Sequence, residues 1–129
     1  MQYMLTVYVD ESGFTRLSPE DQQKGVAAYE AYSEALAKAG AMKASGRLGP
    51  SSSATRVRLV GGKPNVLDGP FIESKEQLGG YFLIDVPDLD AAISWASRSP
   101  TALHGVVEVR PMWERTLLTD DISKYLKPE

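Results

Sequence analysis

The run from Tyr81 to Val86, with the sequence YFLIDV, constrains the fold more than any other stretch of this chain. Apolar side chains occupy both odd and even positions, which is typical of a strand buried on both faces. A rigid corner is predicted before it over Asp68–Phe71, because Pro70 fixes its own φ and favours an extended Gly69. The Asp68 carboxylate can bond the backbone just ahead of it.

The segment between the corner and the strand is short, charged and rich in glycine. Residues 73–77, ESKEQ, favour a helical turn, and Gly79 with Gly80 can end that turn and allow close backbone approach. We therefore predict a corner, a helical turn and a buried strand in succession.

The amino-terminal third predicts a strand followed by a long helix. Gln2 to Val9 is mostly apolar on both faces, which indicates a central strand, and Asp10 to Leu17 is expected to be a polar loop. Ser18 then provides a helix cap, with Pro19 at the first helical position. The predicted helix runs from Pro19 to Ala39, ends at Gly40, and carries apolar residues at helical spacing: Val26, Tyr29, Tyr32, Leu36 and Ala39.

The remaining elements include a second hairpin-like feature. Met42–Leu48 is a weaker strand candidate, whereas Thr55–Leu59 alternates apolar and basic residues and meets Asn65–Asp68 across the Gly61–Gly62 turn. Further along, Asp88 can cap a second helix that breaks near Ser99 and Pro100, and His104–Arg110 is the last predicted strand.

This order of elements indicates an α+β fold. It is the split βαβ arrangement with an inserted β-hairpin between the second and third core strands. Both helices are expected on one face of an antiparallel sheet, which leaves an apolar face for a partner to bury. A homodimer is the simplest partner.

Several separated motifs resemble one known family. DGPF at residues 68–71, ESKEQLGGY at 73–81, FLIDVPDLDAA at 82–92 and VEVRPMWE at 107–114 follow the pattern of the DGPF group of the YCII-related domain family. The resemblance covers residues 1–114 and implies a ferredoxin-like βαββαβ domain that pairs as a dimeric α/β barrel. Residues 115–129 form a carboxyl-terminal extension in which Thr119 is predicted to cap a short helix.

Composition excludes several classes of function. At 129 residues and 14.1 kDa the chain is expected to be one domain, and a net charge of −3 argues against direct nucleic-acid binding. The absence of cysteine excludes a thiolate nucleophile, a disulfide and a cysteine metal site. With one histidine and no recognised carboxylate spacing, we expect no metal and no cofactor. No signal peptide or membrane-spanning run is evident, so we expect a soluble cytoplasmic protein.

Two residues are candidates for acid–base catalysis. His104 is the only histidine, and histidine suits proton transfer near neutral pH, although a hydrogen-bonded histidine at a strand edge is the simpler interpretation. Proteins of the resembled family are thought to pair a histidine on the first helix with an aspartate, which here implies Asp68 of the DGPF motif. Counting back from Gly40 places Tyr29, or Tyr32 one turn on, at the histidine position. A phenol there can donate a hydrogen bond, or can simply pack on the sheet.

The candidate ligand-binding residues are polar or aromatic: Tyr29, Tyr32, Arg47, Glu73 and Lys75. Arg56, Arg58 and Arg110 can also bind a carboxylate or phosphate if two of the arginines converge on the barrel mouth, although an exposed hairpin face is the simpler interpretation for the first two. The favoured function is binding, and acid–base transformation, of a small polar or aromatic molecule in a cleft of a homodimeric barrel. The alternative is an accessory protein that acts by protein contact, since proteins of the DGPF group resemble chains linked to extracytoplasmic-function sigma factors.

Overall fold

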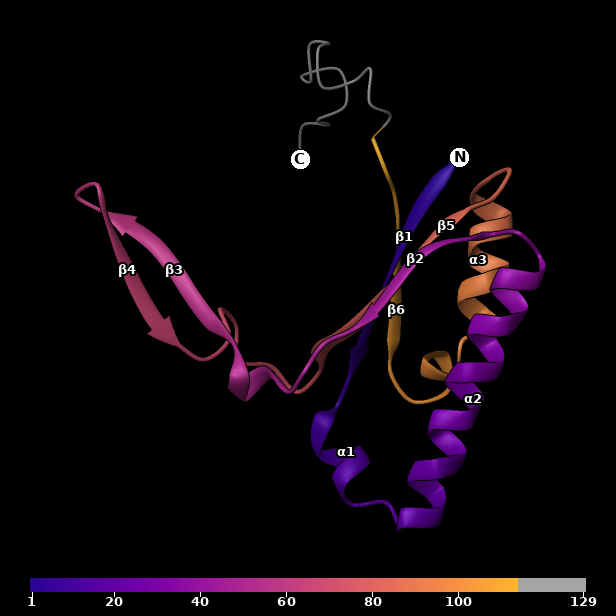
Figure 1. The fold of residues 1–129 in the computed structure, drawn as a ribbon, viewed down its shortest axis with the longest axis horizontal. Coiled ribbons are helices and arrows are strands. Elements are labelled where there is room, and N and C mark those ends of the chain that lie inside the picture. The colour runs from indigo at the N-terminus through magenta and orange to yellow at the C-terminus, as the bar shows by residue number, and fades with distance from the viewer. Residues whose placement is uncertain (114–129) are drawn as a thin grey trace.

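The computed structural model describes residues 1–113 of the chain. Its main sheet is antiparallel and has the order β2-β5-β1-β6 (Figure 1), formed by β1 (Gln2–Val9), β2 (Met42–Arg47), β5 (Gln77–Asp85) and β6 (Val106–Pro111). The central position predicted for Gln2–Val9 is confirmed, because β1 pairs with β5 on one side and β6 on the other. This is the predicted ferredoxin-like arrangement.

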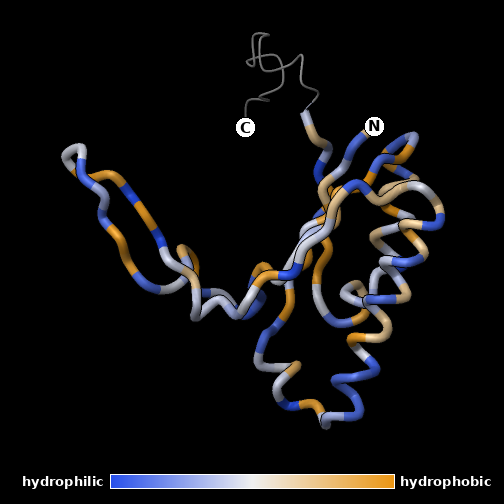
Figure 2. Tube along the Cα trace, viewed as in Figure 1, coloured by the Kyte–Doolittle hydropathy of each residue, from blue (hydrophilic) through white to orange (hydrophobic). Residues whose placement is uncertain are grey.

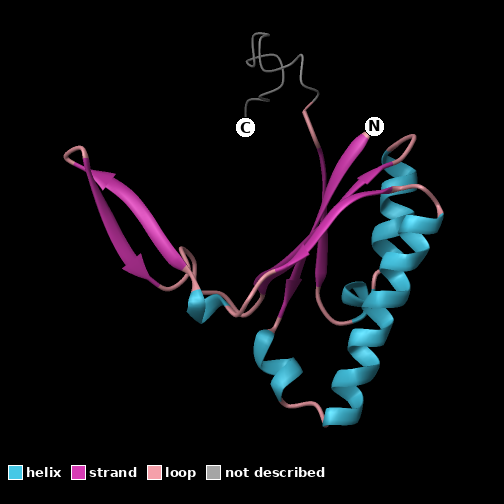
Figure 3. Cartoon of the chain, in the orientation of Figure 1, coloured by secondary structure: helices cyan, strands magenta, loops and turns pink. Residues whose placement is uncertain are grey.

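Two helices pack on one face of the main sheet (Figure 3), namely α2 (Pro19–Lys38) and α3 (Leu89–Arg98). Both begin as predicted: the Ser18 hydroxyl accepts from the Asp21 N–H at 3.1 Å, and the Asp88 carboxylate accepts from the Ala91 N–H at 2.9 Å. None of the helices in the described part of the chain is long and apolar enough to cross a membrane.

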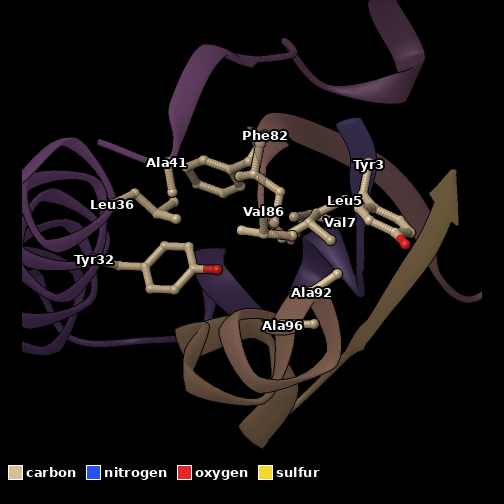
Figure 4. Close-up of a cluster of buried hydrophobic side chains, with 11 residues drawn as sticks. Tyr3, Leu5, Val7, Tyr32, Leu36, Ala41, Phe82, Val86, Ala92 and Ala96 are labelled. Carbon is tan, nitrogen blue, oxygen red and sulfur yellow. The ribbon is translucent and has the colours of Figure 1, made fainter. Parts of the chain in front are cut away.

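The hydrophobic core fills the space between these helices and the sheet. Leu5 from β1, Ile84 from β5 and Leu36 from α2 are completely buried. Figure 4 shows Leu36 and Tyr32 extending from the helix toward Phe82, with Ala92 and Ala96 of α3 closing the same cluster. The side chains that alternate toward the helices therefore fix which face of each strand points inward.

Within residues 1–113, no helix packs on the opposite face of the sheet (Figure 1). Met4 lies opposite Leu83 and Thr6 opposite Tyr81, so these side chains share the face that points away from α2 and α3. A Cβ atom at Gly46 of β2 would lie 2.7 Å from the Tyr81 ring, so the glycine leaves room for that ring on this face. We call Met4, Thr6, Tyr81 and Leu83 the open face, and its existence confirms the predicted one-sided helix packing.

The inserted hairpin is confirmed and forms a separate two-stranded sheet, β3 (Thr55–Val60) with β4 (Lys63–Asp68). Gly61 and Gly62 make the turn with φ values of 58° and 78°, which glycine adopts without strain. The hairpin projects from the body as an arm (Figure 1), and we call residues 55–68 the arm.

The structure corrects the predicted helical turn over residues 73–77. No helix forms there, and β5 starts at Gln77 and includes Gly79 and Gly80. A Cβ at Gly80 would lie 2.7 Å from the Gly46 carbonyl oxygen, so the glycine serves close strand pairing and does not end a helix. Local charge spacing favoured a helix, but pairing with β1 and β2 prevailed.

Three further local features differ from the predictions: the segment after β1, the backbone of Gly69 and the position of His104. The expected loop over residues 10–17 contains α1 (Glu11–Thr15), because the Asp10 carboxylate caps it by accepting from the Ser12 N–H at 3.0 Å. Gly69 has a φ of 97° instead of an extended value. His104 precedes the last strand and follows a short 3-10 helix, η2 (Pro100–Leu103). The helix predicted after Thr119 lies outside the described residues.

Candidate functional site

A hollow of about 390 Å³ lies beside the amino-terminal half of α2. One helix face lines most of it, with Pro19, Gln22, Gln23, Val26, Ala27 and Glu30, and Phe14 of α1 faces them. These α2 positions recur at helical spacing next to the buried face that holds Tyr32 and Leu36. We call this feature the α1–α2 hollow; it combines an aromatic wall, an apolar floor, two amides and one carboxylate.

Arg47 is held at the edge of the α1–α2 hollow. Its guanidinium carbon lies 5.8 Å from the centroid of the Phe14 ring, within the range of a cation–π contact. Because Arg47 ends β2 and Phe14 belongs to α1, this contact ties the edge of the main sheet to the wall of the hollow. Arg47 is therefore a predicted ligand-binding residue that contacts a side chain lining this hollow.

Tyr29 and His104 both contact Thr101. The Tyr29 hydroxyl hydrogen-bonds the hydroxyl of Thr101, which is completely buried in η2. The His104 backbone N–H donates to the Thr101 carbonyl at 3.1 Å. The His104 side chain is exposed and makes no hydrogen bond or ion pair within residues 1–113. Thr101 thus links Tyr29 to His104, through its hydroxyl on one side and its carbonyl on the other.

Tyr32 is a core residue that is 5% exposed. Its hydroxyl donates to the Trp95 carbonyl at 2.7 Å, and its ring packs edge-on against Phe82 with centroids 5.1 Å apart. Burial raises the pKa of Tyr32 to about 12, because the phenolate would lose its hydration; the Arg98 charge opposes this only weakly. These contacts favour packing over ligand binding for Tyr32, the simpler of the two predicted interpretations.

The Tyr32→Phe variant is expected to lower the free energy of unfolding by about 1–2 kcal/mol at neutral pH, because a carbonyl near the end of α3 loses its donor. A pKa raised to about 12 in the folded state stabilises the fold fully below pH ~10 and loses this contribution as pH rises toward ~12. Urea unfolding at several pH values should therefore show an alkaline loss of stability of about 2–3 kcal/mol that is absent in Tyr32→Phe. Tyr8→Phe is the matched control and should retain the alkaline loss; an unchanged profile in Tyr32→Phe would contradict the assignment.

Three other predicted site residues lie away from both places. Asp68 is the exposed last residue of β4 in the arm, and no hydrogen bond or ion pair within residues 1–113 joins it to His104. Glu73 and Lys75 lie exposed in the loop between the arm and β5. The Lys75 charge helps to lower the pKa of Asp10, after the hydrogen bond from Ser12, which is the largest cause. The structure therefore does not assemble His104, Asp68, Glu73 and Lys75 into one cluster.

The arginines that were candidates for anion binding separate into two groups. Arg110 pairs with Glu108 at 3.2 Å on β6. Arg56 and Arg58 share one side of the arm and line a second hollow of about 290 Å³ with Asn65, Leu67 and Phe71. Arg56 and Arg58 are therefore neighbours on the arm, as expected for one face of a hairpin. Among the described residues, no group of three or more acidic, histidine or cysteine side chains forms a metal site.

Three residues that shape these places were not predicted as site residues: Phe14, Glu30 and Thr101. Phe14 was assigned to a loop, so its position opposite α2 depended on an unpredicted helix. Glu30 follows Tyr29 directly, and the spacing from Gln23 through Val26 to Glu30 was a usable signal for a second functional helix face. Thr101 follows Ser99 and Pro100, and the Ser99 hydroxyl accepts from the Thr101 N–H at 3.2 Å as a local cap.

Comparisons with known proteins extend over nearly the whole chain. The family described as "YCII-related domain" matches residues 1–116. A relative, "Uncharacterized protein R00369" of Rhizobium meliloti (strain 1021), is 36% identical over 114 residues, covering 87% of this chain and 92% of the relative. A solved structure of similar fold is 5-chloro-2-hydroxyhydroquinone dehydrochlorinase (TftG) from Burkholderia phenoliruptrix AC1100, in complex with 2,5-dihydroxybenzoquinone. It has a TM-score of 0.50 and 14% identity, and covers 88% of this chain and 94% of that one. The chain described here belongs to the YCII-related domain family.

Proposed function

We propose that this chain binds a small polar or aromatic molecule in the α1–α2 hollow. The observation that carries the proposal is the Arg47–Phe14 stack beside a hollow of about 390 Å³ that also holds Gln22, Gln23 and Glu30. Small-molecule sites commonly have volumes of about 300–1,000 Å³ and combine apolar walls with a few polar groups. The hollow meets both conditions.

The composition of the hollow indicates which ligands fit it. Phe14 offers a ring edge or face to a flat molecule, and the amide of Gln23 can donate to hydroxyl or carbonyl oxygens. The Gln22 amide nitrogen already donates to the Phe14 and Leu17 carbonyls, so the oxygen of that amide is the group that can accept from a ligand. Arg47 adds a fixed positive charge at the edge, which favours ligands carrying partial or full negative charge. The similar fold of a protein solved with 2,5-dihydroxybenzoquinone supports a small oxygenated aromatic as the first compound to test.

Proton transfer remains a second part of the proposal. Glu30 is the carboxylate that lines the hollow, so it is the nearest group able to accept a proton from a bound phenol or enol. His104 stays a candidate base through the Tyr29–Thr101 neighbourhood, whereas Asp68 on the arm has no described contact with either place. Binding is therefore the primary proposal, and catalysis would require Glu30 or His104.

Pairing of two chains through the open face is part of the same proposal. Met4, Tyr81 and Leu83 leave apolar surface on a sheet that has helices on one side only. In Figure 2, hydrophobic segments alternate with neutral and hydrophilic ones along the strands of the main sheet. An antiparallel sheet with one apolar uncovered face is stabilised when a second sheet packs on it, about 10 Å away. A second identical chain supplies such a sheet.

Calorimetric titration of the purified chain with 2,5-dihydroxybenzoquinone, hydroquinone and benzoate tests the binding site. We expect at least one probe to bind once per chain, and Phe14→Ala to weaken it about tenfold because the aromatic wall and its contact with Arg47 are lost. Glu30→Gln should change affinity for the phenolic probes more than for benzoate.

Glu34→Gln is the matched control, because Glu34 lies one turn further along α2 and does not line the hollow. Binding that is equally weak in Glu34→Gln and Phe14→Ala would place the ligand elsewhere. No binding of any probe would reject small oxygenated aromatics as its ligands. Co-purification of the chain with an extracytoplasmic-function sigma factor would instead favour the accessory role predicted as the alternative.

A further inference from the structure

The arm exposes an apolar side that no other part of residues 1–113 covers. Val57 lies opposite Val66 and Leu59 opposite Pro64, so these four side chains share one side of the ribbon. Val57, Leu59 and Val66 are 65%, 68% and 58% exposed. An isolated two-stranded hairpin is marginally stable in water. The arm therefore needs a surface to pack against.

The root of the arm is fixed to the body, so its direction is set. The Ser51 backbone N–H and hydroxyl donate to the two carboxylate oxygens of Glu11 at 2.8 and 2.9 Å. The Gly69 N–H donates to the Ala54 carbonyl at 2.7 Å and closes the base of the hairpin. From this base the arm extends on the side of the sheet opposite to α2 and α3 (Figure 1). It points away from its own helices, toward the side where a second chain would pair.

The charge of the arm is opposite to that of the body. The arm carries Arg56, Arg58 and Lys63 against Asp68, which leaves 11 cations and 16 carboxylates in the rest of the chain. The side chains of Arg56 and Arg58 make no hydrogen bond or ion pair within residues 1–113, and the Arg56 Nε is buried without an acceptor. These arginines project from the side of the ribbon opposite to Val57 and Leu59. The net positive charge of the arm favours a receiving surface that carries carboxylates.

The α1–α2 hollow offers exposed apolar surface and nearby carboxylates, which complement the apolar side and the positive charge of the arm. Phe14 and Val26 are 38% and 39% exposed at its wall and floor, and Glu30 lies at its rim. Asp21 and Glu34 on the same helix make no ion pair among the described residues. Pairing of two chains through the open face places the helical layer of the second chain on the side toward which the first chain's arm extends.

We infer that each arm docks on the second copy of this chain, with its apolar side across the mouth of that copy's α1–α2 hollow. The contact is reciprocal, as two-fold symmetry requires, so each hollow is completed by the partner's arm. Arg56 and Arg58 project from the other side of the ribbon, which is only two strands wide. Their long side chains can therefore bend around its edge and reach the carboxylates beside the hollow. The inference rests on the pairing proposed above. In the dimer, the arm of one chain forms a wall of the other chain's hollow.

Disulfide trapping tests this docking cleanly, because the chain has no cysteine. Two differently tagged variants, Leu59→Cys in the arm and Val26→Cys in the hollow, are mixed and mildly oxidised. We expect a disulfide between the two differently tagged chains, since bridging requires Cα atoms within about 7 Å. Leu59→Cys mixed with Lys38→Cys, at the other end of α2, is the control and should give little bridging.

Charge reversal provides an independent readout by sedimentation. Arg58→Glu should raise the dimer dissociation constant about tenfold, and adding Glu30→Arg to the same chain should restore it to within about threefold. A monomeric wild-type chain, equal bridging to Lys38→Cys, or a dimer without the Leu59–Val26 bridge would overturn the inference. A bridged dimer that binds no aromatic probe would support the arm contact and reject the proposed ligand. An unbridged dimer that binds a probe would support the ligand and reject the arm contact.

Discussion

The Leu36→Ala variant is expected to lower the free energy of unfolding by about 3 kcal/mol, within a range of about 2–5 kcal/mol. Leu36 is completely buried where α2 meets the sheet, and it lies in one cluster with Ile84 and Phe82 (Figure 4). The loss combines removed apolar contacts with a cavity that the surrounding strands cannot fill, because hydrogen bonds on both sides hold β5 in place. Urea denaturation followed by circular dichroism measures it.

Leu103→Ala is the matched control, since it removes the same atoms from a side chain that is 89% exposed. Its effect should stay within about 0.5 kcal/mol. A loss of similar size in both variants would mean that the packing of α2 on the sheet is not the main source of stability. The comparison thus separates burial from the change in residue type.

The Leu83→Asp variant should raise the dissociation constant of the proposed dimer by at least about 100-fold. Leu83 lies on the open face opposite Met4, so pairing would take the new carboxylate out of water and pack it against apolar side chains. Arg110, the cation across β1 on the same face, is already paired with Glu108. The single chain should stay folded, because the side chain points away from the core. Sedimentation velocity over a concentration series measures the shift, and circular dichroism confirms the fold.

Ile93→Asp is the control for this variant, because it adds the same charge on α3 at a side chain that is 47% exposed. It should leave the dissociation constant unchanged. Retained dimerisation of Leu83→Asp would place the interface elsewhere. It would also remove the reason for docking the arm on the helical layer of the second chain. The two interfaces can be told apart, since Arg58→Glu acts on the arm and Leu83→Asp on the sheet.

Local signals in the sequence predicted most of the fold. Strand β1 was predicted with its observed ends, and the starts of α2 and α3 followed from Ser18 and Asp88, because capping depends on a few neighbouring residues. The arm and its turn followed from the Gly61–Gly62 pair. These features depend on residues close in sequence, which is why one sequence was enough.

The tertiary structure decided where local preference and pairing disagreed. Residues 73–77 favour a helical turn by composition, but Gln77 joins β5 because β1 and β2 offer strand partners on both sides. Gly80 was expected to end a helix, whereas it allows β5 to approach the Gly46 carbonyl. Strand pairing is a long-range contact and is not visible in the local sequence.

The candidate site was predicted in part only, for the same reason. The sequence alone determined that Tyr29, Tyr32, Arg47 and His104 were the aromatic and polar groups available, and it determined the family through its ordered motifs. Tertiary structure alone decided that Tyr32 joins the core, that Tyr29 bonds Thr101, and that Arg47 stacks on Phe14 beside a hollow. Helical spacing fixes which face of α2 a residue occupies, but the element that packs on that face depends on contacts between segments far apart in the chain.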